Sequence, residues 1–310
     1  MTEWSGALFG EARHAPLDWL SVVAGLRGDL FAFDVDTRGG ASAGVDSGGE
    51  VDALLSPKLA VIVRPHEQVE LYLNGGGGYH SNDARGTTAQ VDPVDPLVRQ
   101  WGTEAGARWQ PDSRFHVTSV FWFLDSDSEL VFVGDAGSTE AKGSSRRFGV
   151  ELTGFVRPVP WLALDAAYSW SDARFDTLPD GADKIPGGLE HVVSAGATVT
   201  LGSFSTSLRL RHFAAYPLIE DDTQRAGSTT LVQFGTAYTW RRVTLDLAVV
   251  NLFDSKDNDI QYFYASRLNL AEPVGGIDDT HRHPVEPRQL RGTVEDRVLA
   301  AAPAFRADGP

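Results

Sequence analysis

Apolar and polar side chains alternate with a period of two residues along most of this chain. Phe148 and Val150 fall on one side of a predicted strand, and Glu151 falls on the other. The same pattern returns at residues 162–170 and 243–249. Side chains point alternately to the two faces of a β-strand, whereas a helix repeats every 3.6 residues. The alternation therefore predicts an all-β fold in which one face of the sheet is apolar.

The connections between the predicted strands are of two alternating kinds. Tight turns, in which Pro, Gly and Asp supply the turn dihedrals, are expected at 64–67, 110–113, 157–160, 201–203 and 240–242. Long polar connections are expected at about 37–54, 75–98, 126–144, 171–188, 214–228 and 254–286. Long loops at one end of the strands and tight turns at the other are typical of a transmembrane β-barrel, whereas nothing in the architecture of a soluble β-sandwich requires this arrangement.

Strand length and aromatic placement support the same interpretation. The stretches 146–156 and 192–201 have about the 9 to 11 residues that a tilted strand needs to cross the hydrocarbon. Aromatic residues flank both ends of the strands, as interfacial girdles do. Those beside the tight turns are Trp109, Trp161, Phe204 and Trp240, and those near the long connections are Tyr79, Trp122, Trp170, Phe213 and Tyr216.

Composition removes several functional classes. The chain has no cysteine, which excludes disulfides, thiolate metal sites and a cysteine nucleophile. Its net charge of −15 argues against a nucleic-acid partner. The mean hydropathy of −0.18 would suit a soluble acidic protein, but a barrel with a polar lumen and acidic loops has the same average. No catalytic constellation or nucleotide motif stands out, so we do not expect an enzyme.

Several segments resemble the TonB-dependent outer-membrane receptors. The residues that carry the resemblance are Gly25-Leu26-Arg27-Gly28-Asp29, Ser56-Pro57-Lys58-Leu59, 70–86, Asn251-Leu252-Phe253-Asp254, 262–268 and 281–288. The resemblance covers about 17–291. It implies a 22-stranded barrel, plugged by an N-terminal domain, that takes up a ferric siderophore, another metal complex, cobalamin or an oligosaccharide with energy from the TonB complex.

By this resemblance the chain holds about twelve strands of such a barrel, its C-terminal half. We expect an irregular lead-in over 1–16, the barrel over 17–294, and an atypical Ala-rich tail over 295–310. By the same resemblance we expect that the plug, the TonB box, the signal peptide and about the first ten strands have no counterpart in this sequence. Alternation fades after Arg291, so we expect that the reading frame is disrupted near this residue. A half barrel leaves strand edges unpaired in lipid, so the chain alone is expected to aggregate.

Five residues are candidate ligand contacts. Asn82, Asp83 and Arg85 follow the Gly75–Gly78 run at its outer end, and Arg209 and Arg211 face the predicted lumen. The alternatives to ligand binding are structural. The first three residues would cap a loop, and the two arginines would pair with a plug domain. The glycine run lacks the lysine of a phosphate loop, and we expect it to let a strand bend or approach the plug.

His281 and His283 are weak candidates for a metal pair, because residues two apart on a strand point to one face. Solvated or hydrogen-bonded imidazoles are the more common case, and no cofactor is expected. The predicted partners are outer-membrane lipid, a small-molecule or metal-chelate ligand, and TonB acting through the missing plug. The predicted location is the Gram-negative outer membrane. A passive porin-like or adhesin barrel and a secreted soluble β module are the alternatives.

Overall fold

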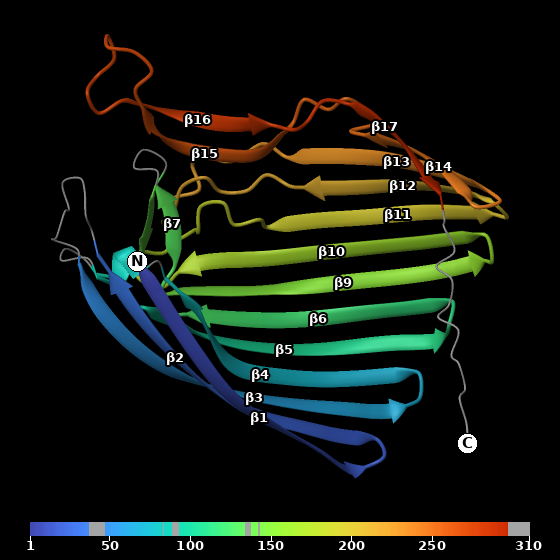
Figure 1. Cartoon of the computed structure of the whole chain (residues 1–310), viewed down its shortest axis with the longest axis horizontal. Coiled ribbons are helices and arrows are strands. Elements are labelled where there is room, and N and C mark those ends of the chain that lie inside the picture. The colour runs from blue at the N-terminus through green and yellow to red at the C-terminus, as the bar shows by residue number, and fades with distance from the viewer. Residues whose placement is uncertain (37–46, 83, 89–92, 134–137, 142, 297–310) are drawn as a thin grey trace, which may run out of the picture.

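A computed structural model describes residues 1–36, 47–82, 84–88, 93–133, 138–141 and 143–296. Its main element is one antiparallel sheet of 13 strands, curved like part of a barrel wall (Figure 1). In sheet order the strands are β1 Thr2–Leu17, β2 Leu20–Val35, β3 Gly48–His66, β4 Val69–Ser81, β5 Leu97–Asp112, β6 Phe115–Ser126, β9 Ser145–Val159, β10 Leu162–Phe175, β11 His191–Leu201, β12 Phe204–Phe213, β13 Thr229–Trp240, β14 Val243–Val250 and β17 Gln289–Asp296.

Two short hairpins and one helical turn complete the described structure. The hairpin of β7 Leu130–Val133 and β8 Ser138–Ala141 lies between β6 and β9 in sequence. The longer hairpin of β15 Asn258–Ser266 and β16 Ile277–Pro284 lies between β14 and β17. The four-residue helix α1, Ala84–Thr87, follows β4. No helix in the described part of the chain is long and apolar enough to cross a bilayer.

The alternation of tight and long connections is confirmed, but the strands extend further than expected: β3 already begins at Gly48, and β4 and β10 continue to Ser81 and Phe175. Tight turns join β1 to β2, β3 to β4, β5 to β6, β9 to β10, β11 to β12 and β13 to β14, and all lie at one end of the strands (Figure 1). In two of them a residue has a left-handed backbone, Gly202 with φ 59° and Arg241 with φ 57°. Such turns match the twist of a hairpin. The long connections lie at the opposite end, called here the long-loop end.

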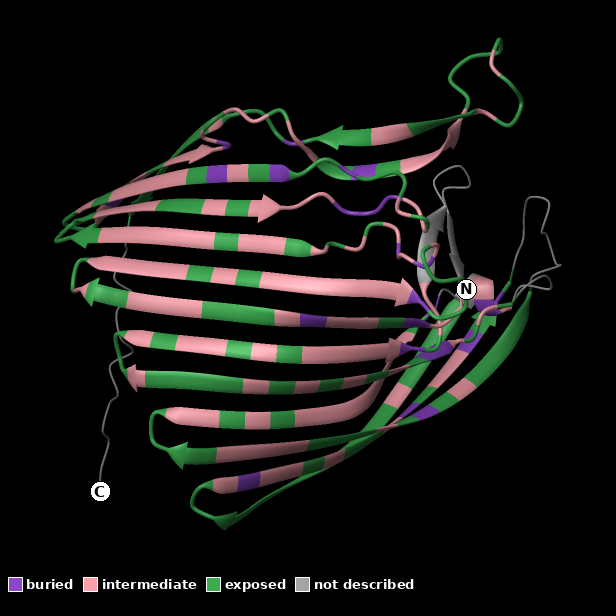
Figure 2. Cartoon of the chain, turned by 180° about the vertical axis from the view of Figure 1, so that it is seen from behind, coloured by how far each residue is buried: buried purple, intermediate pink, exposed green. Residues whose placement is uncertain are grey.

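The strand register fixes the two faces of the sheet. Val150 lies opposite Trp170, and Glu151 lies opposite Ser169, so apolar residues pair with apolar ones across strands. Among the described residues no layer covers the apolar face: Leu208 on β12 is 46% exposed and Tyr238 on β13 is 50% exposed. Burial instead concentrates near the long-loop end (Figure 2), where Val98 is only 1% exposed. An apolar face of this size is suited to contact with lipid.

Three details differ from the expectations. Residues 1–16 were expected to be an irregular lead-in, but Thr2–Leu17 is strand β1, paired with β2 along its length. The main sheet has 13 strands, where the sequence predicted about twelve. The last strand continues past Arg291 to Asp296, because the backbone ladder to β14 needs no side-chain alternation. The expected tail falls almost wholly in 297–310, outside the described residues.

Candidate functional site

The polar face carries a hollow of about 710 Å³. Its floor is formed by Gly76 and Gly78 of β4 and Gly102 of β5, which are adjacent in the register and have no side chains to fill it. The polar residues at its margin include Glu11, Lys58, Asn74, Gln100, Glu104 and Trp122. The volume lies in the range of small-molecule sites. Because its floor has no side chains, another protein segment can also approach the backbone closely there.

The polar groups around this hollow are largely paired with one another. Asn74 Nδ2 donates to Glu104 Oε1 at 2.5 Å, and Lys58 forms an ion pair with Glu11. The indole Nε1 of Trp122 is buried and has no hydrogen-bond partner among the described residues. A buried donor of this kind is costly unless an incoming acceptor satisfies it.

Glycines on the polar face let long side chains cross a strand. A Cβ at Gly196 of β11 would clash with the guanidinium of Arg209, which passes over it from β12 to Asp165 on β10. A Cβ at Gly25 of β2 would lie 2.6 Å from Cε of Lys58. Lys58 in turn passes from β3 to Glu11 on β1. The wall thus neutralises part of its own charge.

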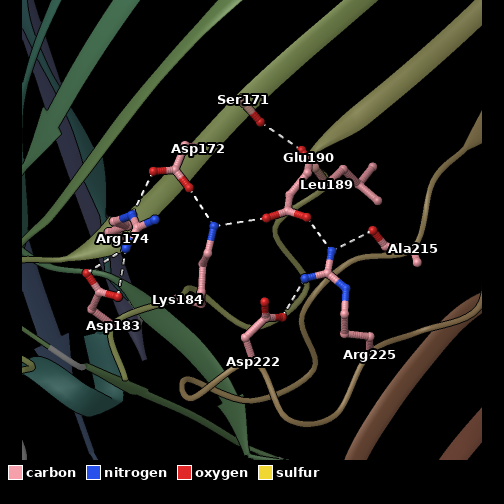
Figure 3. A network of polar contacts seen from close by, with 10 residues as sticks. All are labelled: Ser171, Asp172, Arg174, Asp183, Lys184, Leu189, Glu190, Ala215, Asp222 and Arg225. Atoms are coloured by element: carbon pink, nitrogen blue, oxygen red, sulfur yellow. Dashed lines mark hydrogen bonds and ion pairs between the residues drawn. The ribbon is translucent and has the colours of Figure 1, made fainter. Parts of the chain in front are cut away.

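A network of charged residues ties two long connections together at the long-loop end (Figure 3). Lys184, in the connection after β10, donates to Asp172 Oδ1 at 2.6 Å and to Glu190 Oε1 at 2.9 Å. Arg225, in the connection after β12, forms an ion pair with Glu190 and donates to Asp222 Oδ1 at 2.5 Å. Glu190 therefore receives a cation from each of the two connections.

Arg174 extends the network, and backbone hydrogen bonds reinforce it. Arg174 donates to Asp172 Oδ2 at 2.7 Å and to Asp183 at 3.1 and 3.2 Å. The amide of Lys184 donates to the Glu220 carbonyl at 3.0 Å, and the amide of Gly187 donates to the Pro217 carbonyl at 2.9 Å. These bonds join residues 176–190 to residues 214–228.

The electrostatics of the network favour the charged states. Burial raises the pKa of Glu190, but hydrogen bonds from Lys184 and Arg225 outweigh burial and hold that pKa below its ordinary value of 4.5. Burial lowers the pKa of Lys184, but hydrogen bonds to Asp172 and Glu190 outweigh this effect and raise it above 10.5. Both groups are consequently ionised across the physiological range.

The β15–β16 hairpin joins the same surface through apolar and amide contacts. Phe263 of β15 packs against the buried cluster of Tyr216, Leu218 and Ala226. The Gln261 side chain, 5% exposed, accepts from the Gly227 amide at 3.3 Å and donates to the Gly227 carbonyl at 3.1 Å. We call residues 176–190, 214–228 and the β15–β16 hairpin the loop layer.

The Asn251–Asp254 segment anchors the last long connection. Asn251, 2% exposed and with φ 50°, donates through Nδ2 to the carbonyls of Ser255 and Glu286, both at 3.0 Å. Its Oδ1 accepts from the Ser255 amide at 2.8 Å. Asp254, with φ 54°, accepts from the Arg288 amide at 3.0 Å. The two side chains thereby hold the start and end of this connection together.

The predicted ligand residues fall in different surroundings. Asn82 is 5% exposed, and its Nδ2 donates to the Asp95 carbonyl at 2.7 Å within its own connection. Asp83 lies outside the described residues, and Arg85 lies in α1. Arg209 is paired with Asp165. Arg211 points to the same polar face, between Ser194 and Leu231, and is exposed. Their role in ligand binding remains a prediction.

The two weak metal candidates have other contacts. His281 stacks on Tyr264 with ring centroids 3.8 Å apart, and His283 Nδ1 lies 2.7 Å from Asp259 Oδ1. In the described part of the chain no three His, Asp or Glu residues form a group that could hold a metal ion. The charged network of Lys184, Glu190 and Arg225 was missed by sequence reasoning, because no local spacing signals an ion pair between two separate loops.

Comparisons with known proteins identify the architecture. A family model described as "TonB dependent receptor-like, beta-barrel" matches residues 1–252. No curated protein matches the sequence. Among solved structures, the ferric yersiniabactin uptake receptor FyuA of Yersinia pestis aligns with TM-score 0.74 and 14% identity, over 94% of this chain and 45% of that one.

Two further structures give similar alignments. The copper transporter OprC aligns with TM-score 0.72 and 19% identity, over 94% of this chain and 47% of its own. The ferric-catecholate import receptor Fiu of Escherichia coli K12 aligns with TM-score 0.69 and 18% identity, over 94% and 44%. The chain thus spans less than half the length of these structures. At such identities the likeness concerns the fold.

Proposed function

The chain belongs to the TonB-dependent receptor β-barrel family of the Gram-negative outer membrane, and from this premise we propose that it forms part of the wall and outer surface of an uptake barrel. The barrel takes up a scarce small ligand, with energy from TonB delivered through a plug domain. The observation that carries the proposal is the family match combined with the sheet: one face is apolar, the other is polar and hollowed, and the long connections gather at one end.

A metal chelate is the ligand class that best fits this proposal. The structural relatives named above are described as receptors or transporters for ferric chelates or copper. On the polar face Asp165 neutralises Arg209, while Arg211 has no ion pair among the described residues. An exposed guanidinium on a lumen wall attracts an anionic ligand. We therefore place Arg211 on the path of an anionic metal chelate.

The direction of the outer strands indicates what must complete the barrel. Both β1 and β17 run from the long-loop end towards the tight turns, so the two edges of the sheet are parallel to each other. A barrel of antiparallel strands cannot close by pairing these edges, either within one copy or between two copies. It closes only with an odd number of additional strands, which agrees with the even strand number of bacterial single-chain barrels.

Uptake of radiolabelled iron(III), offered as a catecholate complex, tests the proposal in cells that express the natural protein containing these strands. We expect accumulation that is lost in a strain without TonB. Arg211→Gln should reduce uptake, while Arg157→Gln, at a tight turn on the opposite side of the membrane, should not. Equal accumulation with and without TonB would instead support the passive-channel alternative.

A further inference from the structure

The apolar face of the sheet carries a groove of about 550 Å³ across its first three strands. The floor contains Gly6 of β1, Gly28 of β2 and Ala53 of β3. Its walls are Trp4, Leu8, Leu30 and Leu55, which are 59%, 83%, 41% and 68% exposed. The ring of Trp4 lies over Gly6, since a Cβ there would be 3.2 Å from Trp4 Cη2.

The register places this groove on the side of the wall that faces lipid. Leu8 lies opposite Gly28, and Gly28 lies opposite Leu55, so these residues share one face. The oppositely directed neighbours Ala7 and Asp29 point to the polar face with Arg27 and Glu11. The hydrocarbon of the bilayer is therefore the medium that covers the groove, and its surface is continuous with the rest of the lipid-facing wall.

The groove lies at the outer boundary of the hydrocarbon. Leu20 and Leu30 are the first and eleventh residues of β2. At about 3.4 Å per residue and a tilt near 40°, Leu30 is roughly 26 Å from the tight-turn end, which matches the height of the apolar band. Trp4, beyond Leu30, is then at the interface, where an indole ring is favoured.

We propose that this groove is a binding site for one acyl chain of a lipid in the outer leaflet. The acyl chain enters beside the Trp4 ring, which covers Gly6, and packs along Gly28 between Leu8 and Leu55. A smooth wall offers an acyl chain contact on one side only, whereas the groove contacts it on its floor and both sides. The larger apolar area buried per methylene makes this position preferred over the surrounding lipid.

The native protein in nanodiscs of diphytanoylphosphatidylcholine provides the test, because the methyl-branched chains of this matrix lipid are wider than a straight acyl chain and compete less well for the groove. The probe is a straight-chain phosphatidylcholine brominated near the upper part of one acyl chain, which quenches nearby tryptophans. The fluorescence of Trp4 is obtained as the difference between the native protein and Trp4→Phe. Trp101, which lies on the same face but outside the groove, is measured in the same way with Trp101→Phe. We expect Trp4 to be half-quenched at an about fourfold lower probe fraction than Trp101, the effect of burying about one further methylene.

Matched variants test whether the quenching of Trp4 depends on the groove or on the apolar surface in general. Ala53→Phe fills the groove and should bring the Trp4 midpoint to that of Trp101. Gly10→Phe adds the same side chain on the same face, where a Cβ meets nothing within 4 Å, and should leave the Trp4 midpoint unchanged. Leu55→Ala, which removes one wall without adding bulk, should raise the midpoint even if Ala53→Phe fails to insert. Equal midpoints for Trp4 and Trp101 in the native protein, or no response to Leu55→Ala, would overturn the proposal.

Discussion

The guanidinium of Arg209 crosses the whole width of β11 to reach Asp165, with Nη1 at 2.6 Å from both carboxylate oxygens. The two residues lie on strands that do not pair with each other, and Gly196 stands opposite both of them. The absence of a side chain at this one position makes the contact possible. The glycine and the ion pair therefore form one structural unit on the lumen wall.

Gly196→Ala should break this ion pair. The added Cβ would clash with the guanidinium of Arg209 and displace it from Asp165. Both side chains are largely exposed, so we expect a loss of less than about 1 kcal/mol in stability. Thermal unfolding of the native protein and its variants measures the change. Gly235→Ala on the same face is the control. Its added Cβ would lie 3.2 Å from the hydroxyl oxygen of Ser207, a small side chain that can move away.

A double-mutant cycle identifies the cause. In an Asp165→Asn background the ion pair is already lost, so Gly196→Ala should have little further effect. An undiminished effect in that background would mean that the alanine acts on the backbone and not through Arg209.

Lys184→Met should loosen the contact between residues 176–190 and 214–228. The variant leaves the carboxylates of Asp172 and Glu190 close together without their shared cation, and Lys184 is mostly buried. We expect the local opening free energy to fall by about 1 to 3 kcal/mol. Hydrogen exchange at the amides of Lys184 and Gly187, which donate across the two connections, measures it.

Lys256→Met is the matched control for this experiment. Lys256 is paired with Asp254, but its side chain is 78% exposed, so removal of its charge should not change those two amides. If Lys184→Met left their exchange rates as in the native protein, the backbone contacts alone would hold residues 176–190 and 214–228 together.

The loop contact should depend on pH through Glu190. Its pKa is below 4.5 in the folded state because the bonds from Lys184 and Arg225 outweigh burial. A carboxyl group with a lowered pKa stabilises the fold above its unfolded value, and this stabilisation is lost as the pH falls through the folded value. Protection of the Lys184 amide should thus be constant from about pH 5 upwards and decline below about pH 4.

Glu190→Gln tests the assignment, because the amide cannot titrate in this range. The variant should have lower protection at neutral pH and a flatter response to acid. An unchanged acid response would assign the titration to another carboxylate of the network, such as Asp172.

The fold was largely predictable because its determinants are local. Alternation along β9 and β10 and the turn residues at Gly202 and Arg241 are visible in the sequence, and they fixed strand faces and the two ends of the sheet. The segment Thr2–Leu17 was missed because its alternation is weakened by glycine, alanine and Pro16. Its strand conformation comes from pairing with β2, which is a non-local interaction.

The candidate site was less predictable for the same reason. Lys184 and Arg225 lie on separate connections, and only the closed fold brings both to Glu190. The sequence placed Arg209 correctly on the polar face, but its partner Asp165 could not be assigned without knowing that β11 lies between them with a glycine in register.

Asn251→Asp should destabilise the base of the last long connection. The carboxylate can still accept from the Ser255 amide, but it cannot donate to the carbonyls of Ser255 and Glu286, and it would be a buried charge. The loss of two buried hydrogen bonds predicts a cost of about 2 to 4 kcal/mol.

Asn251→Gly keeps the left-handed backbone at φ 50° and removes all three side-chain bonds, so it separates the side-chain contribution from the backbone contribution. Hydrogen exchange at the Ser255 and Arg288 amides should rise in both variants, and more than at the Leu208 amide in the middle of β12. An exchange rate at Arg288 equal to that of the native protein would mean that Asp254 anchors the connection without Asn251.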